Sequence, residues 1–305
     1  MVNGIINVYK EKGYTSFDVV AKLRGIFHQK KIGHTGTLDP DAQGVLPVCL
    51  GKATRVCDLL TDKDKVYKAV LLLGQETDTQ DITGQVLNQA KVNVTEQAVY
   101  DVISQFVGRQ KQVPPMYSAL KVNGKKLYEL ARAGKEVERQ ARHVDLPAIE
   151  ILEIKFPVGK FRVECSKGTY IRSLCADIGE KLCCGGTMQS LVRTRVGEFR
   201  LADALTLAQL QELRDTERLE EALLPTDRIF SDFPMLHVEE KWRKLIDNGN
   251  AFYPGQTVEQ TTHPAGEWVR IYREDDSFVG IYAYDETKEW YKPVKVFPSN
   301  TESRK

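Results

Sequence analysis

The residues of this 305-residue chain that are best placed for chemistry lie in a glycine-rich loop around Asp39. In the run Gly33–Pro47 (GHTGTLDPDAQGVLP), glycines lie on both sides of Asp39. The following residue, Pro40, disfavours a helical backbone at Asp39. A carboxylate presented in this way suits three kinds of site: a calcium loop, a phospho-aspartate, or a carboxylate that acts on a bound substrate as a nucleophile or through its charge.

The neighbours of Asp39 argue against the first two. A calcium loop that starts at Asp39 requires a bidentate Glu at its twelfth position, where this chain has Leu50. A phospho-aspartate would follow directly on a buried apolar strand, and residues 33–37 do not form one. A carboxylate that acts on a bound substrate therefore remains. A metal-dependent hydrolase stays open as an alternative, with four candidate carboxylates: Asp39, Asp41, Asp78 and Asp81.

Elements on both sides must hold this loop in place. An apolar strand around residues 5–8 leads into a helix whose predicted N-cap is Ser16, with Asp18 in the first turn, where the helix dipole favours a carboxylate. Residues 30–44 then form a long loop, and residues 45–50 a buried strand. Further expected elements are strands over 67–73, 149–156 and 161–165, and helices after Thr95, over 125–133, over 170–182 and after Thr206.

Composition bounds the class of protein. Apolar residues make up 42% of the chain, enough for a substantial core. No apolar run approaches the roughly 18 residues of a transmembrane helix, and the first ten residues lack the features of a signal peptide, so we expect a cytoplasmic protein. The six cysteines and five histidines show no zinc spacing, and no metal site is expected.

Charge and β-strand signals are unevenly distributed along the chain. The net charge is only +1, but residues 109–142 contain nine basic and three acidic residues, a net charge of +6. A solvated surface and a phosphate-contacting arm both fit this composition.

After about residue 227 the chain consists of short β-rich runs separated by turn residues, which is typical of a small all-β module.

Motifs outside the loop connect the chain to a known family. The loop, together with Gly51–Thr54, resembles the signature of the bacterial TruB family of tRNA pseudouridine synthases. Further runs resemble that family's motifs in the same order, over roughly residues 4–230: Lys10–Ser16, Asp64–Tyr67, Pro115–Tyr128, Cys165–Arg172 and Leu191–Gly197. One departure is Glu11, because the family commonly has Pro after the first Lys.

The resemblance implies an isomerase that converts uridine 55 in the T loop of tRNA to pseudouridine. The target base must leave its stack before the N-glycosidic bond is broken and the uracil is rejoined through carbon. Asp39 would be the catalytic carboxylate, Arg172 would hold its pKa down, and Tyr67 would stack on the target base. No cofactor is expected.

The resemblance also implies supporting roles for other residues. Tyr170 and Leu191 would line the base pocket. His34 would displace and occupy the stack of the T loop, and Lys10 would buttress the loop around Asp39. Five residues of the basic segment would grip the T arm through its phosphates: Lys121, Lys125, Lys126, Arg132 and Arg142.

The implied fold is the mixed α+β pseudouridine synthase fold on a largely antiparallel central sheet. A catalytic domain, residues 1–230 with the basic insertion at about 109–142, would precede a PUA-like, RNA-binding β domain at 231–305. Guide-RNA-dependent rRNA relatives share the loop but resemble residues 109–142 less, so we expect a stand-alone monomer that needs tRNA and no protein partner. Such a relative, and a non-catalytic protein that binds or folds tRNA, remain the alternatives.

Overall fold

An eight-stranded sheet forms the centre of the structure, a computed structural model that describes residues 2–297. Residue 1 and residues 298–305, the outer ends of the two expected domains, lie outside the described residues. The strand order is β1-β3-β13-β4-β12-β11, with β2 paired to β3 and β14 to β13. The β3–β13 pair is parallel and the other pairs of this sheet are antiparallel, which confirms the predicted mixed fold. The strands are β1 (Gly4–Lys10), β2 (Ile32–His34), β3 (Gln43–Leu50), β4 (Lys65–Leu73), β11 (Ala148–Lys155), β12 (Val158–Cys165), β13 (Gly186–Val196) and β14 (Phe199–Arg200).

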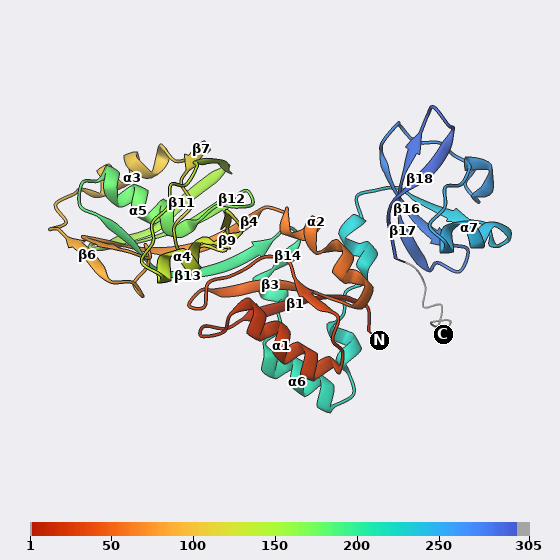
Figure 1. Cartoon of the computed structure of the whole chain (residues 1–305), viewed down its shortest axis with the longest axis horizontal. Helices are drawn as coiled ribbons and strands as arrows, with labels where there is room; N and C mark the ends of the chain where they lie inside the picture. The colour runs from red at the N-terminus through yellow and green to blue at the C-terminus, as the bar shows by residue number, and fades with distance from the viewer. Residues whose placement is uncertain (1, 298–305) are drawn as a thin grey trace.

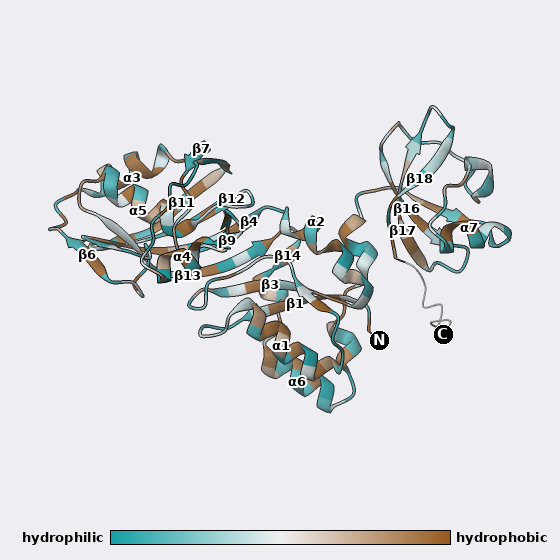
Figure 2. Ribbon diagram, in the orientation of Figure 1, coloured by the Kyte–Doolittle hydropathy of each residue, from teal (hydrophilic) through white to brown (hydrophobic). Residues whose placement is uncertain are grey.

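Helices cover the two halves of this sheet separately. Helices α1 (Ser16–Phe27) and α6 (Leu207–Asp215) pack side by side against β1 and β3 and share one apolar core with them (Figure 1). Both helices alternate brown apolar and teal polar residues in Figure 2, as helices with one buried face do. The second core lies under α3 (Glu96–Ser104) and α5 (Ile171–Lys181), on the half of the sheet formed by β4, β11, β12 and β13.

Side-chain caps set where these helices begin. The N-cap of α1 is Thr15: its hydroxyl accepts a hydrogen bond from the Asp18 amide (3.0 Å), and the Asp18 carboxylate accepts one from the Thr15 amide (2.8 Å). The prediction that Ser16 is the cap was wrong by one residue, because the buried Ser16 hydroxyl instead accepts a hydrogen bond from the Leu38 amide (2.9 Å). Thr95 and Thr206 cap α3 and α6, as predicted.

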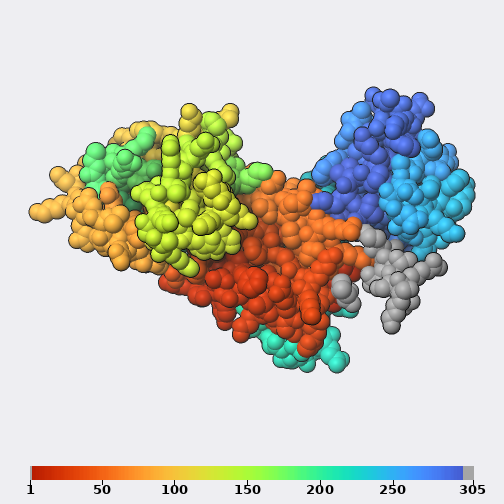
Figure 3. Space-filling model, viewed as in Figure 1, coloured from red at the N-terminus to blue at the C-terminus, as the bar shows by residue number. Residues whose placement is uncertain are grey.

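The basic segment forms an insertion between α3 and β11. A two-stranded ribbon of β7 (Gly108–Gln112) and β10 (Arg142–Leu146) forms its base. Its outer part consists of β8 (Lys121–Val122), β9 (Lys125–Lys126) and α4 (Leu127–Arg132). In Figure 3 this yellow-green segment lies against the red N-terminal part of the chain, which carries Asp39. A separate hairpin, β5 (Gln75–Thr77) and β6 (Val86–Gln89), follows β4.

A second, smaller sheet lies to one side of this body (Figure 1). Its order is β15-β16-β17-β18, with its own apolar core, as the β-rich runs predict. A mixed cluster that includes Phe230, Ile281 and Phe297 packs it against the main body, and Lys295 forms an ion pair with Asp58 (2.8 Å). The elements are β15 (Met235–Val238), α7 (Arg243–Asp247), β16 (Trp268–Arg273), β17 (Phe278–Asp285) and β18 (Trp290–Val296).

Short helical segments connect the larger elements. They are α2 (Cys57–Thr61) and the 3-10 turns η1 (Gly51–Val56), η2 (Leu201–Asp203), η3 (Leu219–Ala222), η4 (Thr226–Phe230), η5 (Glu240–Trp242) and η6 (Pro254–Gln256). Between residues 2 and 297, no helix has the length and apolar character needed to cross a membrane.

Candidate active site

The loop that carries Asp39 spans residues 35–42, at the boundary between the two halves of the sheet. It is shorter than the predicted loop over 30–44 because Ile32–His34 pair with β3 as strand β2. The Thr35 hydroxyl donates to the Pro47 carbonyl (3.0 Å), and the Gly13 amide donates to the Pro40 carbonyl (2.9 Å). With the Ser16–Leu38 hydrogen bond, these contacts fix the loop on both sides of Asp39.

Lys10, at the end of β1, holds this loop from beneath. Its side chain is fully buried, and its Nζ donates to the carbonyls of Ala42 (2.7 Å), Pro40 (3.0 Å) and Glu11 (3.1 Å). Burial lowers the pKa of Lys10 to about 8, although the carboxylates of Asp39 and Asp41 oppose this. The structure therefore places Lys10 against the loop around Asp39.

A second buried cation, Arg193 on β13, holds the other side of the loop. Its Nε donates to the Val45 carbonyl (2.7 Å), its Nη2 to the Gly36 carbonyl (3.2 Å) and its Nη1 to the Thr37 carbonyl (3.4 Å). The sequence-based assignment missed Arg193. The available signal was its place in the Leu191–Gly197 motif, where an Arg occupies a position that becomes the interior of a buried strand.

Gly44 allows β3 to approach β13 at this point. Its φ is +108°, and a Cβ added there would lie 2.2 Å from the backbone oxygen of Arg193. The two strands pair in parallel here, Gly44 opposite Arg193. The close approach that brings Arg193 to the loop therefore requires a glycine at position 44.

Arg172, on the first turn of α5, faces Asp39 directly. Its Nε lies 3.0 Å from Oδ2 of Asp39, and its Nη2 lies 3.4 Å from Oδ1. The Arg172 side chain is 6% exposed, whereas the Asp39 side chain is 39% exposed. The pair is thus buried on the arginine side and open on the carboxylate side, where a substrate can reach it.

The pKa of Asp39 is shifted in the opposite direction to the one expected from the sequence. Burial raises the pKa of the Asp39 carboxyl, the Arg172 guanidinium lowers it, and the nearby Asp81 carboxylate raises it further. The pKa is therefore not held below its usual range: Arg172 limits a rise that burial causes. Loss of this ion pair would therefore raise the pKa of Asp39 further.

Two of the predicted pocket residues lie on neighbouring strands beside Asp39. Tyr67 on β4 is buried, and burial raises the pKa of its hydroxyl while adjacent Arg193 lowers it. Arg193 and Tyr67 are register partners across β13 and β4, and Leu191 lies two residues earlier on β13. The antiparallel pairing therefore places Tyr67 and Leu191 at the same part of the sheet.

Two further predicted substrate-binding residues are Tyr170, expected to line the pocket, and His34, expected to occupy the T-loop stack. Tyr170 is the N-cap residue of α5, and its backbone exchanges hydrogen bonds with the Gln112 side chain at the base of the insertion (2.8 and 3.0 Å). His34 ends β2, and its Nδ1 accepts a hydrogen bond from the Gly36 amide (3.3 Å). Burial, and then the charge of Arg193, lowers the pKa of His34, which favours a neutral ring.

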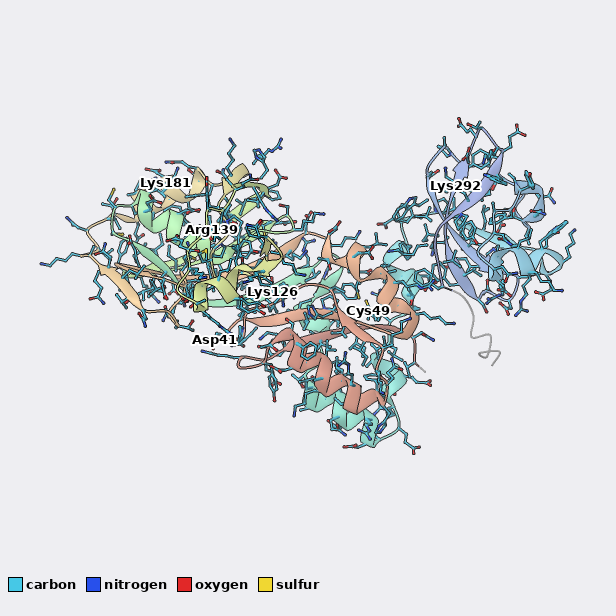
Figure 4. The ribbon with its side chains drawn as sticks, viewed as in Figure 1. Asp41, Cys49, Lys126, Arg139, Lys181 and Lys292 are labelled. Carbon is cyan, nitrogen blue, oxygen red and sulfur yellow. The ribbon has the colours of Figure 1, made fainter. Side chains whose placement is uncertain are left out.

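The five predicted RNA-binding residues all lie on the insertion and none contacts Asp39. Lys121, Lys125, Arg132 and Arg142 are exposed, and Lys126 is half-buried beside Tyr128. Within residues 2–297, Arg139 is the one basic residue of the segment 109–142 that has an ion-pair partner, Glu136. Figure 4 shows Lys126 and Arg139 on this insertion, far from Lys292 on the small sheet. Most of the +6 charge is therefore available to an external partner.

The four carboxylates of the alternative metal site have protein partners and do not face a common point. Asp41 pairs with Lys12 (3.6 Å), and Asp78 accepts from the Gln85 amide (2.7 Å). The other two contact different nitrogens of Arg172: Oδ2 of Asp39 lies 3.0 Å from Nε, and Oδ2 of Asp81 lies 3.8 Å from Nη1. In the described part of the chain, no three His, Cys, Asp or Glu side chains form a group that could hold a metal ion. The geometry therefore does not support a metal-dependent hydrolase.

Comparisons with known proteins fit this architecture. Residues 24–171 match the N-terminal domain of the TruB family pseudouridylate synthases, and residues 172–231 match the C-terminal domain of tRNA pseudouridylate synthase B. A relative from Lachnoclostridium phytofermentans named tRNA pseudouridine synthase B is 55% identical over 97% of this chain and 100% of its own length. One of the same name from Alkaliphilus oremlandii is 47% identical over 92% of both chains.

Solved structures share the fold over nearly the same length of the chain. An H/ACA RNP bound to a substrate RNA containing 2′-deoxyuridine contains a chain with a TM-score of 0.72 and 26% identity, over 98% of this chain and 86% of that one. A Cbf5-Nop10-Gar1 complex contains another, with a TM-score of 0.72 and 29% identity, over 97% and 85%. The fold and the family matches define a pseudouridylate synthase, which is an isomerase. Within that class, the chain belongs to the TruB family.

Proposed function

We propose that this enzyme isomerises uridine 55 in the T loop of tRNA to pseudouridine, with Asp39 as its catalytic carboxylate. The observation that carries the proposal is the Asp39–Arg172 ion pair. The half-exposed carboxylate of Asp39 lies in the family's loop motif, and the buried guanidinium of Arg172 on α5 holds it at 3.0 Å. Full-length relatives named tRNA pseudouridine synthase B support tRNA as the substrate. The enzyme is thus a tRNA pseudouridine synthase, and position 55 is the specific target we assign.

In the proposed reaction the target uridine leaves the T-loop stack and enters the pocket beside Asp39. The ionised Asp39 acts on the flipped nucleotide, and the glycosidic bond between the sugar C1′ and N1 of the uracil breaks. The uracil turns and rejoins C1′ through its C5, which then loses its proton while N1 gains one. The ring of Tyr67 stacks on the base, with Tyr170 and Leu191 lining the pocket. The neutral ring of His34, which burial favours, suits occupation of the space that the base vacates in the stack.

Recognition of the T arm is assigned to the insertion at about 109–142. Its exposed lysines and arginines contact phosphates, because they lack acidic partners within the described chain and are open to solvent. We divide the protein into a catalytic domain, residues 1–230, and an RNA-binding β domain, residues 231–305. It acts on tRNA in the cytoplasm as a monomer, without a guide RNA or protein partner.

The test compares Asp39→Asn with Asp41→Asn on unmodified tRNA transcript. Pseudouridine is mapped by mass spectrometry, and tRNA affinity is measured in parallel. Asp39→Asn should abolish pseudouridine at position 55 and retain tRNA binding, because the amide keeps the shape and loses the charge. Asp41→Asn, whose exposed side chain pairs only with Lys12 among the described residues, should retain activity. Wild-type rates for Asp39→Asn would refute the catalytic assignment.

The same assay tests the alternatives. A protein that only binds or folds tRNA would bind the transcript and leave it free of pseudouridine. The likeness to a chain of the Cbf5-Nop10-Gar1 complex favours testing a guide-dependent enzyme as well. Activity of the purified chain on tRNA without added RNA or protein would contradict guide dependence, and size-exclusion chromatography with light scattering would check the monomer.

A further inference from the structure

Three separate segments meet at the guanidinium of Arg172. Its Nε donates to Asp39 (3.0 Å), its Nη1 donates to the carbonyl of Thr79 in the β5–β6 turn (3.0 Å), and its Nη2 donates to the carbonyl of Tyr117 in the insertion (2.8 Å). The Nη2–Tyr117 hydrogen bond is shorter than the 3.4 Å contact that the same nitrogen makes with Asp39. The backbone of the insertion is therefore a direct partner of the residue that faces the carboxylate.

The side chain of Tyr117 fastens its own backbone in this position. Its hydroxyl lies 3.4 Å from Oδ2 of Asp78, and Oδ1 of Asp78 accepts a hydrogen bond from the Gln85 amide (2.7 Å). Gly84 keeps the β5–β6 turn tight, because a Cβ there would lie 2.3 Å from the Asp78 carboxylate. Tyr117 thus joins the insertion to the β5–β6 turn, with its carbonyl directed at Arg172.

The geometry of a guanidinium links these contacts. Its five donors lie in one plane in a fixed fork, so a shift of the acceptor at Nη2 rotates the group and moves Nε away from Asp39. Tyr117 lies within the segment 109–142, which carries the charges assigned to phosphate contact. Energy from binding RNA far from the reacting atoms can in this way be used to orient the group beside Asp39.

We infer that Tyr117 is a positioning residue for pseudouridine formation: its hydrogen bond to Asp78 fixes its carbonyl on Arg172, and so sets the orientation of Arg172 toward Asp39. The inference rests on the proposed catalytic role of Asp39. It assigns to the insertion a second task besides binding, which is to hold Arg172 in its orientation toward Asp39.

The experiment is a mutant cycle of Tyr117→Phe, Asp78→Ala and the double variant, measured in single-turnover reactions at saturating tRNA. Each single change should lower the rate of pseudouridine formation by about three- to ten-fold, the effect of one side-chain hydrogen bond. The double variant should lose no more than the larger single effect, because both changes remove the same contact. The dissociation constant for tRNA should stay within about two-fold of wild type.

A second readout separates positioning from a general structural effect. Weaker orientation of Arg172 lets burial raise the pKa of Asp39 further, so the acidic limb of the rate–pH profile should move to higher pH in Tyr117→Phe. Tyr100→Phe removes an exposed hydroxyl on α3 and should change neither rate nor profile.

The possible outcomes distinguish this inference from the proposed function. An unchanged rate in Tyr117→Phe, additive losses in the double variant, or a loss confined to tRNA affinity would overturn the positioning role. Asp39→Asn is measured in the same series: if it retains activity, the catalytic assignment fails, whatever Tyr117 does. If Asp39→Asn is inactive and Tyr117→Phe behaves as wild type, the inference alone fails.

Discussion

Replacing Lys10 with methionine tests whether the loop around Asp39 is held by a buried charge. The substitution keeps an unbranched side chain of similar length and removes the three donors that reach Glu11, Pro40 and Ala42. The Pro40 carbonyl keeps the Gly13 amide as a donor. Of the three contacts, the one to the Ala42 carbonyl is buried, so the loss of the lysine partner costs most at this acceptor.

Two opposing free energies set the effect on stability. An unpaired buried carbonyl costs about 1–3 kcal/mol. The opposing term comes from the buried charge. The pKa of Lys10 is about 8 in the folded chain instead of 10.5, so burying the charged lysine lowers the free energy of unfolding by about 3 kcal/mol at neutral pH. Methionine carries no charge and removes this cost. The two nearly cancel, so we expect the melting temperature to change by no more than about 5 °C.

The effect on catalysis should be much larger than the effect on stability. Asp39 lies between Leu38 and Pro40 on the segment that Lys10 fixes, and a displacement of about 1 Å at a reacting group can lower a rate about 100-fold. We expect Lys10→Met to lower the single-turnover rate of pseudouridine formation by about 10- to 100-fold, with tRNA affinity unchanged. The acidic limb should also move to higher pH, because the Lys10 charge lowers the pKa of Asp39.

The pH dependence of stability and rate above about pH 8 gives an independent check, because the direction of each change can be predicted. The pKa of Lys10 is lower in the folded chain than in the unfolded chain, so the unfolded chain binds more protons between about pH 8 and 10.5. Wild-type stability should therefore rise relative to Lys10→Met across this window. Over the same window the wild-type rate should fall, because a neutral amine has two donors for three carbonyls.

A matched control is Lys12→Met, two residues away, where the lysine side chain is 60% exposed and pairs with Asp41 at 3.6 Å. It should leave rate and stability near wild type. The reasoning is refuted if Lys10→Met retains the wild-type rate, or if its loss of rate only follows a loss of folded protein.

Three further changes have defined outcomes. Arg172→Lys removes the paired fork that lowers the pKa of Asp39, so the acidic limb of single-turnover rates should move to higher pH and the rate should fall at least about 100-fold. Reversing Lys125 and Lys126 to Glu should weaken tRNA binding and reduce the slope of log affinity against log salt by about two, measured by filter binding from 50 to 200 mM salt. Gly44→Ala places a Cβ 2.2 Å from the backbone of β13 at a φ of +108°, so it should lower stability by about 3 kcal/mol or more, seen as a lower melting temperature.

Matched controls make these outcomes specific. Lys30 and Lys31 form an exposed lysine pair outside the insertion, and reversing them should affect tRNA affinity less than reversing Lys125 and Lys126. Gly255→Ala adds a Cβ with no heavy atom within 4 Å and should keep the wild-type melting temperature. An unchanged acidic limb, salt slope or melting temperature would contradict the corresponding prediction.

The sequence predicts the repeating parts of this fold well. Apolar periodicity and threonine caps locate α3 and α6, and apolar runs locate β1, β3, β4, β11 and β12. No strand was predicted over residues 186–196, where the structure has β13. The cap of α1 shows the limit of local patterns. Thr15 and Ser16 are both good caps by type, and the choice depends on the amide of Leu38, which approaches Ser16 only in the folded chain. Local sequence contains no record of that neighbour.

The site shows the same division between residue type and tertiary environment. A motif resemblance points to Asp39 and Arg172, and the structure brings them into contact. The net direction of the Asp39 pKa could not be predicted, because it depends on how deeply the loop is buried and on Asp81, which is adjacent only through folding. Arg193 was missed because arginine is seldom fully buried, and its three acceptors belong to a segment far away in sequence.

The distance along the chain between Arg193 and its acceptors affects when the protein can become an enzyme. Arg193 bonds the Val45 carbonyl across 148 positions, and Arg172 reaches Asp39 across 133. On a ribosome that adds about 5–20 residues per second, the loop emerges roughly 7–30 s before the arginine that clamps it. A nascent or truncated chain that ends before residue 193 presents the family's loop motif without its clamp. Catalytic competence therefore arrives late in synthesis, after the insertion assigned to tRNA binding has been made.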